Sequence, residues 1–401
     1  MVSDVIEVDI LKVFIVGVDT GNPLGLLGST YMEKELKMLG YEIQQFPAKN
    51  TDSLKHSFEA CAQPQALILC PLTGKLPAEA ACIRAAAEVC GKTLSENNEI
   101  AHRLVKSAKI SEQEAAKLAM LPDGARIFPC RHSLLPGFEI AGEGFHIVVL
   151  PSDKEEQNSL FLNYLYQILN KTSSSPCCSR VLRIMEMSME EVEEQLKDLL
   201  AAPKPCVALY KKRSEIIVRI SDNNPDRQQA AKDCKTVLNI AAERLGEHVY
   251  GIDVSGIEQA VALLCANKNI RIAFAESGSA GLAAKRFLNV DKEKKLIYST
   301  YACQPEQMDL EKLGINDKIG QTFGPVSANV AAAMALGASK QEEKDLLGLA
   351  ITLPNAVFKT RKAYIAAVLN GVCMMQELDA SNYRSLTQMT EDAVAKMFNL
   401  A

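Results

Sequence analysis

The alternation of apolar strand-like runs with helix-like segments limits the fold of this chain more than any other feature. In the first part, KVFIVGV (12–18) precedes a segment with helical spacing, and ALILC (66–70) precedes an Ala-rich segment at 77–90. Beyond Asp253, IEQAVALLCAN leads to IRIAFAES, and strand and helix patterns then alternate as far as a final helix at 384–399. This order predicts α/β domains with mostly parallel sheets, in which ligands bind beyond the carboxyl ends of the strands.

A polar stretch, KTSSSPCC (171–178), interrupts the alternation. It is rich in serine, contains a proline and has no periodicity, so it predicts a linker. From Arg180 the order becomes strand, helix, strand, strand and helix, ending at Gly246. This order predicts a small α+β module between the two α/β parts.

Composition and charge narrow the classes of function. Of the 401 residues, 48% are hydrophobic and 23% are charged, as is usual for globular domains. A formal net charge of -5 gives no general attraction to nucleic acid. No apolar stretch approaches the length of a membrane span, and acidic residues stand where a secretory signal would be basic. We therefore expect a cytoplasmic protein that binds neither nucleic acid nor membrane.

The 12 cysteines and 5 histidines do not follow a metal-binding pattern. The cysteines have no CxxC spacing, and the adjacent pair Cys177 and Cys178 cannot supply four ligands. The histidines lie far apart in the sequence. We expect buried thiols in a reducing compartment, with no metal site and no cofactor.

The stretch FAESGSAGLAAKRF (274–287) is the strongest candidate for a ligand site. An apolar strand ends at Glu276, small residues follow, and a helix begins. Small residues let backbone amides approach a phosphate, and the helix N-terminus adds partial positive charge. The same residues are typical of helix capping, so Glu276 is either a functional carboxylate or a capping group. A nucleophilic serine in this turn would need a base, and no histidine lies near it in the sequence.

Segments from all three parts resemble the competence/damage-inducible CinA family. KLAMLPDGARIFPCRHSLLPGF (117–138) resembles the family's KQALLPEGATVLPNPVGTAPGF. SRVLRIMEMSMEEVEEQL and ERLGEHVYGID (243–253) are similar to the start and the exit of its KH-like domain. AESGSAGLAAKRFLNV resembles AESCTGGLLAARLTDV, and GPVSANVAAAMALGA resembles GAVSEEVALAMAEGA. The resemblance covers nearly the whole chain.

This resemblance implies two α/β domains joined by a small α+β module. It places a domain like the molybdopterin-binding MoaB/Mog fold at 1–170 and a KH-like domain at 178–253. A domain like those that deamidate nicotinamide mononucleotide follows at 256–401. The resemblance also implies self-association, and a homodimer is the commonest form. The Ala-rich helix at 328–339 is either a subunit contact or core.

The N-terminal motifs of the family are only partly present. Its GGLGPTxDD loop, used with a nucleotide and a divalent metal, appears as PLTGKLPAE and keeps Gly74 and Glu79. Its opening motif is reduced to GVDTGNPLGLLG, with Asp19 in the acidic place and Gly28 where Asn is expected. Asp19, Gly74 and Glu79 remain candidate ligand-binding residues. Because metal-assisted pyrophosphate cleavage needs the missing oxygens, we do not expect ADP-ribose hydrolysis.

The C-terminal catalytic motifs also depart from the family. The resemblance implies a Ser from a GSS segment, activated by the Tyr and Lys of TYSNEAK. An ungapped comparison places Lys294, Gln304 and Asp309 at those three positions. Aligning Tyr301 with the family's Tyr places Glu306 at the Lys position and leaves the Ser position unfilled. Either comparison removes the nucleophile and base pair.

Other positions of the C-terminal site are retained. Thr352 corresponds to the Thr of TGIAGPGG, and Arg384 to the Arg of GDR. Together with the turn they give the candidate site. Its candidate catalytic residues are Ser279, Thr352 and Arg384, and its candidate ligand-binding residues are Glu276, Ser277, Gly278 and Gly281.

The leading hypothesis is a CinA-like protein with eroded catalytic motifs that binds a nucleotide or acts as an interaction protein. The alternative is an active nicotinamide-nucleotide amidohydrolase in which Ser277 or Ser299 replaces the missing nucleophile. A second alternative is an oligomeric scaffold with empty pockets. RNA binding by the KH-like module has the least support, because the module has no GxxG loop flanked by basic residues.

Overall fold

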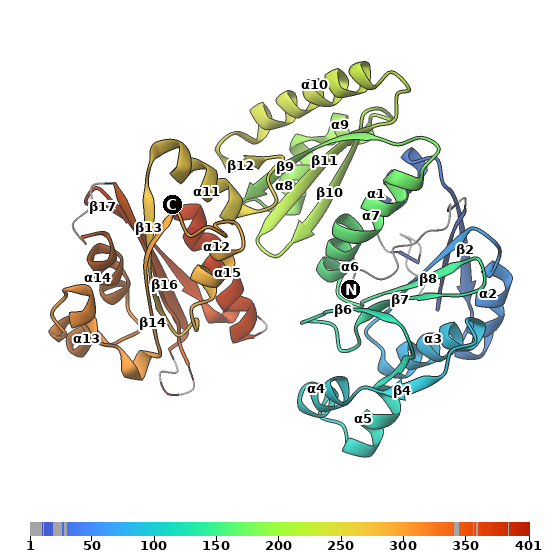
Figure 1. Cartoon of the computed structure of the whole chain (residues 1–401), viewed down its shortest axis with the longest axis horizontal. Helices are drawn as coiled ribbons and strands as arrows, with labels where there is room; N and C mark the ends of the chain where they lie inside the picture. The colour runs from blue at the N-terminus through green and yellow to red at the C-terminus, as the bar shows by residue number, and fades with distance from the viewer. Residues whose placement is uncertain are drawn as a thin grey trace. The chain divides into compact units, whose positions relative to one another are not determined.

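The computed structural model describes residues 10, 12–18, 26–27, 30–340, 345–355, 357, 360–383 and 385–401. It confirms the α/β fold class, with four sheets and flanking helices (Figure 1). The chain divides into two compact units. The first contains Met1–Val181, Ser188–Lys212 and Ile216–Leu245, and the second contains Leu182–Met187, Arg213–Glu215 and Gly246–Ala401.

The first unit is built on a six-stranded sheet of order β2-β1-β3-β8-β7-β6. Its strands are β1 (Lys12–Val18), β2 (Glu42–Ala48), β3 (Ala66–Pro71), β6 (Arg126–Phe128), β7 (Gly137–Ala141) and β8 (His146–Leu150). Strands β2, β1, β3 and β8 are parallel to one another, whereas β7 pairs antiparallel with both β8 and β6. The parallel strands agree with the alternation in the sequence.

Successive strand residues point to opposite faces of this sheet, and both sets are apolar. Helices therefore cover both faces. Val13 and Ile15 join one core cluster, while Phe14 and Val16 join the other. The helices are α1 (Thr30–Met38), α2 (Leu54–Cys61), α3 (Leu76–Val89), α4 (Asn98–Ala108), α5 (Glu112–Leu118), α6 (Lys154–Leu160) and α7 (Tyr166–Thr172). A short ribbon pairs β4 (Leu94–Glu96) with β5 (Met120–Pro122).

The middle module has a four-stranded sheet of order β10-β11-β9-β12. Its strands are β9 (Cys178–Met185), β10 (Cys206–Lys212), β11 (Glu215–Asp222) and β12 (Val249–Ile252), and its helices are α8 (Met189–Gln195), α9 (Lys197–Ala201) and α10 (Arg227–Leu245). Buried residues of β10 and β11 belong to the same core cluster as α1 and α7. Most of the module therefore shares a core with the N-terminal sheet.

A buried charged network lies inside this shared core. Glu35 on α1 lies 2.9 Å from Arg219 Nε on β11, and it accepts hydrogen bonds from the hydroxyls of Tyr210 and Ser221. The Arg219 guanidinium also lies 3.4 Å from the centroid of the Tyr166 ring. Breaking a buried ion pair of this kind leaves an uncompensated charge, so the network ties α1 to the middle sheet.

The connection at 171–178 is held by specific hydrogen bonds rather than extended as a free linker. The Ser173 hydroxyl donates to the Leu39 carbonyl oxygen at 2.5 Å, and the Cys177 amide donates to Asn170 Oδ1 at 2.7 Å. Cys177 is buried in the shared core. The polar composition gave no sign of these contacts, because their partners lie on other elements.

The second unit has a five-stranded sheet of order β14-β13-β15-β16-β17. Its strands are β13 (Arg271–Ser277), β14 (Ile297–Cys303), β15 (Leu346–Thr352), β16 (Lys362–Leu369) and β17 (Val372–Asp379). Strand β13 is parallel to both of its neighbours, and β16 and β17 continue antiparallel. The residues of β17 do not alternate between apolar and polar, so periodicity does not predict this strand. The preceding Asn370-Gly371 is nevertheless a strong hairpin signal.

Two layers of helices enclose this sheet (Figure 1). The helices are α11 (Ile257–Lys268), α12 (Leu282–Leu288), α13 (Lys318–Phe323), α14 (Ala328–Ser339) and α15 (Leu386–Leu400). Helices α11, α12 and α15 pack on one face, and α14 packs on the other. The Ala-rich face of α14 is thus largely buried in the core. Its sequence allowed either this or a subunit contact. Within the described residues, no helix has the length and apolar character needed to cross a membrane.

Candidate functional site

The candidate site lies at the carboxyl end of β13, where the strand turns into α12. Strand alternation directs Phe274 and Glu276 toward the α12 face and Ala275 and Ser277 toward the α14 face. The neighbouring strands β14 and β15 end beside β13, because Ser277 is in register with Cys303 on one side and with Thr352 on the other. The predicted strand, turn and helix are therefore present.

The Glu276 carboxylate caps α12. It is almost fully buried and accepts hydrogen bonds from the Ala283 amide at 3.0 Å and the Ala284 amide at 2.9 Å. The Ser279 hydroxyl donates to the same carboxylate at 2.6 Å. These amides belong to the first turn of the helix, which a phosphate would otherwise use. Of the two roles that the sequence allowed, Glu276 makes the contacts of a capping group.

The turn itself requires left-handed backbone conformations. Gly278 has φ +85°, and a Cβ at that position would lie 2.9 Å from the Leu353 carbonyl oxygen. Gly281 has φ +72°. Ala280 between them has φ +54°, which costs an L-residue roughly 1–2 kcal/mol relative to an ordinary helical conformation. The turn is therefore built at some cost in backbone strain.

Ser277 and Thr352 form a buried pair of hydroxyls on the α14 face. They are in register on the parallel strands β13 and β15, and neither side chain is exposed. Among the described residues, neither hydroxyl has a hydrogen-bond partner. The backbone around them is tightly joined, because the Leu353 amide donates to the Ser277 carbonyl oxygen at 3.0 Å. The structure thus brings these two candidates together, and within the ranges that it describes neither hydroxyl is paired with a base.

The positions that correspond to the family's Ser and Tyr lie on either side of β14. Lys294 is exposed in the turn before β14, and Gln304 follows the end of that strand. Tyr301 lies on β14, where its hydroxyl accepts a hydrogen bond from the Asp309 amide at 2.9 Å. Burial raises the pKa of Tyr301 to about 12. Ser299 is also on β14, in register with Ala273.

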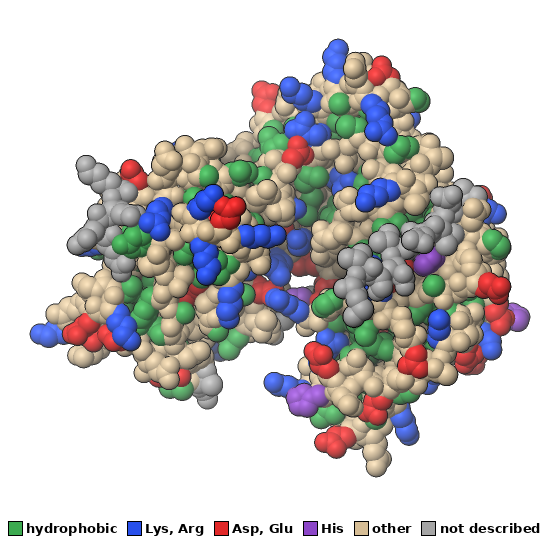
Figure 2. Space-filling view, in the orientation of Figure 1, with side chains coloured by type: hydrophobic (Ala, Val, Ile, Leu, Met, Phe, Trp, Pro, Cys, Tyr) green, Lys and Arg blue, Asp and Glu red, His purple; other side chains and the backbone are tan. Residues whose placement is uncertain are grey.

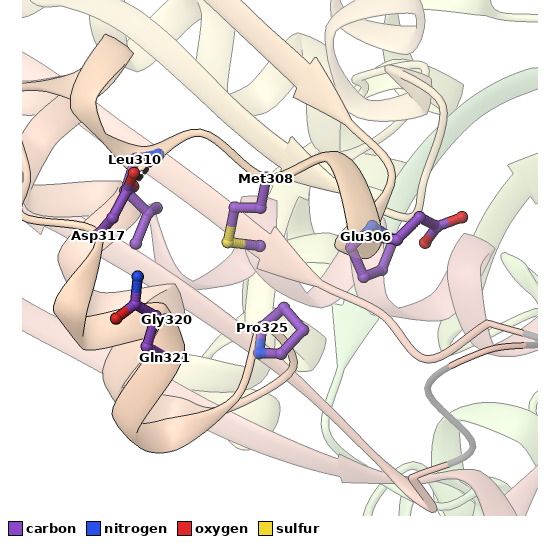
Figure 3. A pocket seen from close by; sticks show the side chains of 8 residues that line it. Glu306, Met308, Leu310, Asp317, Gly320, Gln321 and Pro325 are labelled. Atoms are coloured by element: carbon purple, nitrogen blue, oxygen red, sulfur yellow. Dashed lines mark hydrogen bonds between the residues drawn. The ribbon is translucent and has the colours of Figure 1, made fainter.

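Glu306, at the alternative Lys position, lines a pocket that the sequence did not indicate (Figure 3). The pocket has a volume of about 260 Å³. Its lining residues are Pro305, Glu306, Met308, Leu310, Asp317, Gly320, Gln321 and Pro325. Glu306 accepts a hydrogen bond from Asn355 Nδ2 at 2.6 Å, and Asp317 accepts one from the Leu310 amide at 2.8 Å. Among the described lining residues, the charged groups are the carboxylates of Glu306 and Asp317, which disfavour a phosphate.

The N-terminal candidates Gly74 and Glu79 contact each other. The Gly74 amide donates to Glu79 Oε1 at 2.6 Å, and the Glu79 side chain is buried at the start of α3. Burial raises the pKa of Glu79, although the bond from Gly74 opposes that shift. The carboxylate therefore holds the loop after β3. The remaining candidates, Asp19 and Arg384, and also Gly28, lie outside the described residues.

The first unit also contains a group of backbone amides that could bind an anion but are bound by a side-chain carboxylate of the same chain. The amides of Arg131, His132 and Ser133, in the segment that replaces NPVGT, donate to the Glu156 carboxylate at 2.5, 3.0 and 3.0 Å. Burial opposes ionisation of Glu156, but the hydrogen bonds from Ser133, Arg131 and His132 outweigh it and lower the pKa. No pattern in the sequence pointed to Glu156, because it lies on α6, far along the chain from these amides.

Metal-ligating side chains do not converge within the part of the chain that the structure describes. No group of three or more His, Cys, Asp or Glu side chains there has a geometry that could hold a metal ion. On the face displayed in Figure 2, Lys and Arg side chains are interspersed with Asp and Glu. The described arrangement thus offers hydroxyls, backbone amides and carboxylates as its chemical groups.

Comparison with known proteins gives the same domain order as the fold. A model of the damage-inducible protein CinA KH domain matches residues 179–251, and a model of the CinA C-terminal domain matches residues 254–352. These matches define an α/β protein with a KH-type module followed by a C-terminal sheet domain. The chain belongs to the CinA family, as the resemblance in its sequence implied.

Individual relatives extend this assignment along the chain. A competence-damage inducible protein of Caldicellulosiruptor saccharolyticus is 27% identical over 370 residues, which cover 88% of each chain. A CinA-like protein of Dictyoglomus turgidum is 29% identical over 237 residues, covering 59% of this chain and 57% of the relative. The solved structure of the competence/damage inducible protein CihA from Agrobacterium tumefaciens is 18% identical, with 36% of this chain and 93% of that chain covered. Its TM-score is 0.32, which is too low to bear on function.

The strain at Ala280 leads to a testable prediction. We expect Ala280→Gly to raise the free energy of unfolding by about 0.5–1 kcal/mol, because glycine adopts positive φ without a Cβ clash but loses more entropy on folding. Urea denaturation measures the change. As a control, Ala262→Gly in the helix α11 should have the opposite sign, near 1 kcal/mol destabilising. An unchanged or lower stability for Ala280→Gly would show that the turn is not strained.

The contacts of Glu156 predict a pH-dependent contribution to stability. Since the folded-state pKa is lowered, the contribution is full above the ordinary carboxyl pKa and is lost as the pH falls through the lowered value. We expect Glu156→Gln to cost about 1 kcal/mol at neutral pH, because the side chain is partly exposed. The difference from wild type should shrink below about pH 4.5.

Denaturation at a series of pH values tests this expectation for Glu156. Glu99→Gln is a suitable control, because Glu99 is an exposed carboxylate in the first turn of α4. A Glu156→Gln difference that stays constant down to acid pH would contradict the anion site formed by residues 131–133.

Proposed function

We propose that this CinA-family protein acts as an interaction protein rather than as a hydrolase. Of the two roles in the leading hypothesis, interaction has more support than nucleotide binding, because internal carboxylates occupy the amide groups that would bind a phosphate. The observation that carries the proposal is the capping of α12 by Glu276. A substrate phosphate at that helix terminus would have to displace a buried carboxylate and would be repelled by it.

The state of Ser277 supports the absence of amide hydrolysis. A serine becomes nucleophilic when an adjacent general base accepts its proton. The Ser277 hydroxyl is fully buried, and no described residue forms a hydrogen bond with it. Both alignments of the family's Lys give an acidic residue, Asp309 or Glu306, and neither replaces the cationic group of that position.

The same reasoning supports the absence of pyrophosphate cleavage by the N-terminal sheet. Glu79 is committed to the Gly74 amide, and Glu156 is committed to the amides of the segment that replaces NPVGT. Metal-assisted cleavage needs carboxylates that are free to hold the metal. These carboxylates support the loops instead.

One observation favours the rival amidohydrolase. The Ser279 hydroxyl lies 2.6 Å from Glu276 Oε2, within the distance at which a carboxylate can accept a nucleophile's proton. The Ser279 side chain is however only 6% exposed, and the same carboxylate also accepts two helix amides. This arrangement leaves little access for a substrate amide, so the capping role has more support.

Ammonia release from nicotinamide mononucleotide tests the proposal on the full chain. We expect no release above the level of a protein-free control, because no base in the described part of the chain is paired with Ser277 and because Ser279 is almost fully buried. We also expect no shift in melting temperature with pyridine or adenine nucleotides, since a ligand that binds the native state must stabilise it.

Three variants make the assay decisive. Ser277→Ala and Ser279→Ala remove the candidate nucleophiles of the turn, and Ser299→Ala removes the alternative on β14. Ammonia release by the wild type that falls in any one of them would overturn the proposal and identify the nucleophile. Equal background values in all four proteins agree with an interaction role.

A further inference from the structure

The pocket beside Glu306 combines an apolar middle with an acidic residue at each end. Asp317 and Glu306 lie at opposite ends of the lining, and Met308 and Pro325 lie between them (Figure 3). The volume of about 260 Å³ corresponds to about nine water molecules, at roughly 30 Å³ for each molecule in the liquid. The pocket can therefore hold an elongated small molecule that is polar at both ends and apolar between them.

The Asp317 carboxylate forms one end of the pocket. Asp317 immediately precedes α13, where an aspartate usually accepts a hydrogen bond from an amide of the first helical turn, but its side chain does not cap the helix. Its Oδ1 accepts the Leu310 amide at 2.8 Å instead. Among the described residues, no cation forms an ion pair with Asp317, and the nearby Lys312 pairs with Asp309 at 3.5 Å. Within the described chain, the charge of Asp317 is therefore not offset by an ion pair.

Glu306 forms the other end. It lies in a short turn after β14, is exposed, and accepts a hydrogen bond from Asn355 Nδ2 at 2.6 Å. The Asn355 amide is neutral, so this bond orients the carboxylate without offsetting its charge. No Lys, Arg or His in the described ranges forms an ion pair with Glu306. Both ends of the pocket thus attract a positive charge.

The lining between the two ends narrows the class of cation. Met308 has a flexible thioether side chain, and Leu310 and Pro305 are apolar, so these residues suit a methylene chain. The described lining contains no aromatic ring, which is the group that usually recognises a quaternary ammonium ion. No group of metal-ligating side chains converges in the part of the chain that the structure describes. These features favour primary ammonium groups on an aliphatic chain.

We propose that this pocket binds an aliphatic diamine. One ammonium group donates to Asp317, the other donates to Glu306, and the methylene chain lies against Met308 and Pro325. Hydrogen bonds between charged groups are stronger than those between neutral groups, so both ends contribute to affinity. A lysine side chain of a partner protein carries one ammonium group and would occupy only one end.

The diamine site goes beyond the proposed interaction role and does not rest on it. Diamine binding is measured without nicotinamide mononucleotide, and ammonia release is measured without a diamine. Failure of one proposal is therefore distinguishable from failure of the other.

Equilibrium dialysis of the full chain with isotope-labelled cadaverine tests the pocket. Low ionic strength is used, because salt screens exposed charges. We expect saturable binding of one diamine per chain. Pentylamine and N-acetyl-lysine amide should compete about threefold more weakly or worse, because each has a single ammonium group and loses one ion pair. Pentanediol, which has no charge, should not compete.

Conservative variants locate the bound diamine. Asp317→Asn and Glu306→Gln each remove a charge, while the amide keeps an oxygen that can accept the internal hydrogen bond. Each should raise the dissociation constant of cadaverine by about threefold or more. Glu311→Gln is the matched control, because Glu311 is an exposed carboxylate of a neighbouring turn and is not among the lining residues. Melting temperatures should show that all three variants fold.

Three results would overturn the diamine site. The first is the absence of saturable cadaverine binding by the wild type. The second is an equal loss of affinity in Asp317→Asn, Glu306→Gln and Glu311→Gln, which would indicate only a general attraction to an acidic protein. The third is equal competition by cadaverine, pentylamine and N-acetyl-lysine amide, or an effect of only one of the two lining variants, which would show that a single ammonium group is bound.

Discussion

The Glu276 carboxylate is the interaction on which the account of the second unit depends. It lies at the carboxyl end of β13 and accepts hydrogen bonds from two amides in the first turn of α12 and from the Ser279 hydroxyl, so it joins the strand to the helix. A helix N-terminus is a ready site for an external anion, and here an internal anion occupies it. The same contact that stabilises the turn therefore removes the group that would bind a phosphate.

Two other carboxylates follow the same rule. Glu156 accepts the amides of residues 131–133 in the first unit, and Asp291 accepts the amides of Lys295, Leu296 and Ile297 before β14. Charged acceptors make stronger hydrogen bonds to backbone amides than neutral ones do. The loops of this chain are thus held by internal charge, and this stability leaves fewer amide groups for ligands.

The sequence predicted the features that depend on local pattern and not those that depend on distant contacts. The order of strands and helices apart from β17, and the turn after β13, follow from periodicity and residue type. For Glu276 the residue types left a capping role and a functional carboxylate open. The contact of Glu156 with Arg131, the packing of Ser173 against Leu39 and the pocket beside Glu306 join residues that no local pattern connects. Strand β17 was predictable from Asn370-Gly371, whereas its exposure on both faces required the sheet order. The MoaB/Mog likeness of residues 1–170 and the roles of Asp19 and Arg384 stay predictions.

A crystal structure of the protein grown with excess nicotinamide mononucleotide tests the central claim most directly. The account predicts that Glu276 keeps its bonds to the Ala283 and Ala284 amides and that no phosphate lies at the N-terminus of α12. A nucleotide phosphate bound to those amides, with the Glu276 carboxylate displaced, would contradict it.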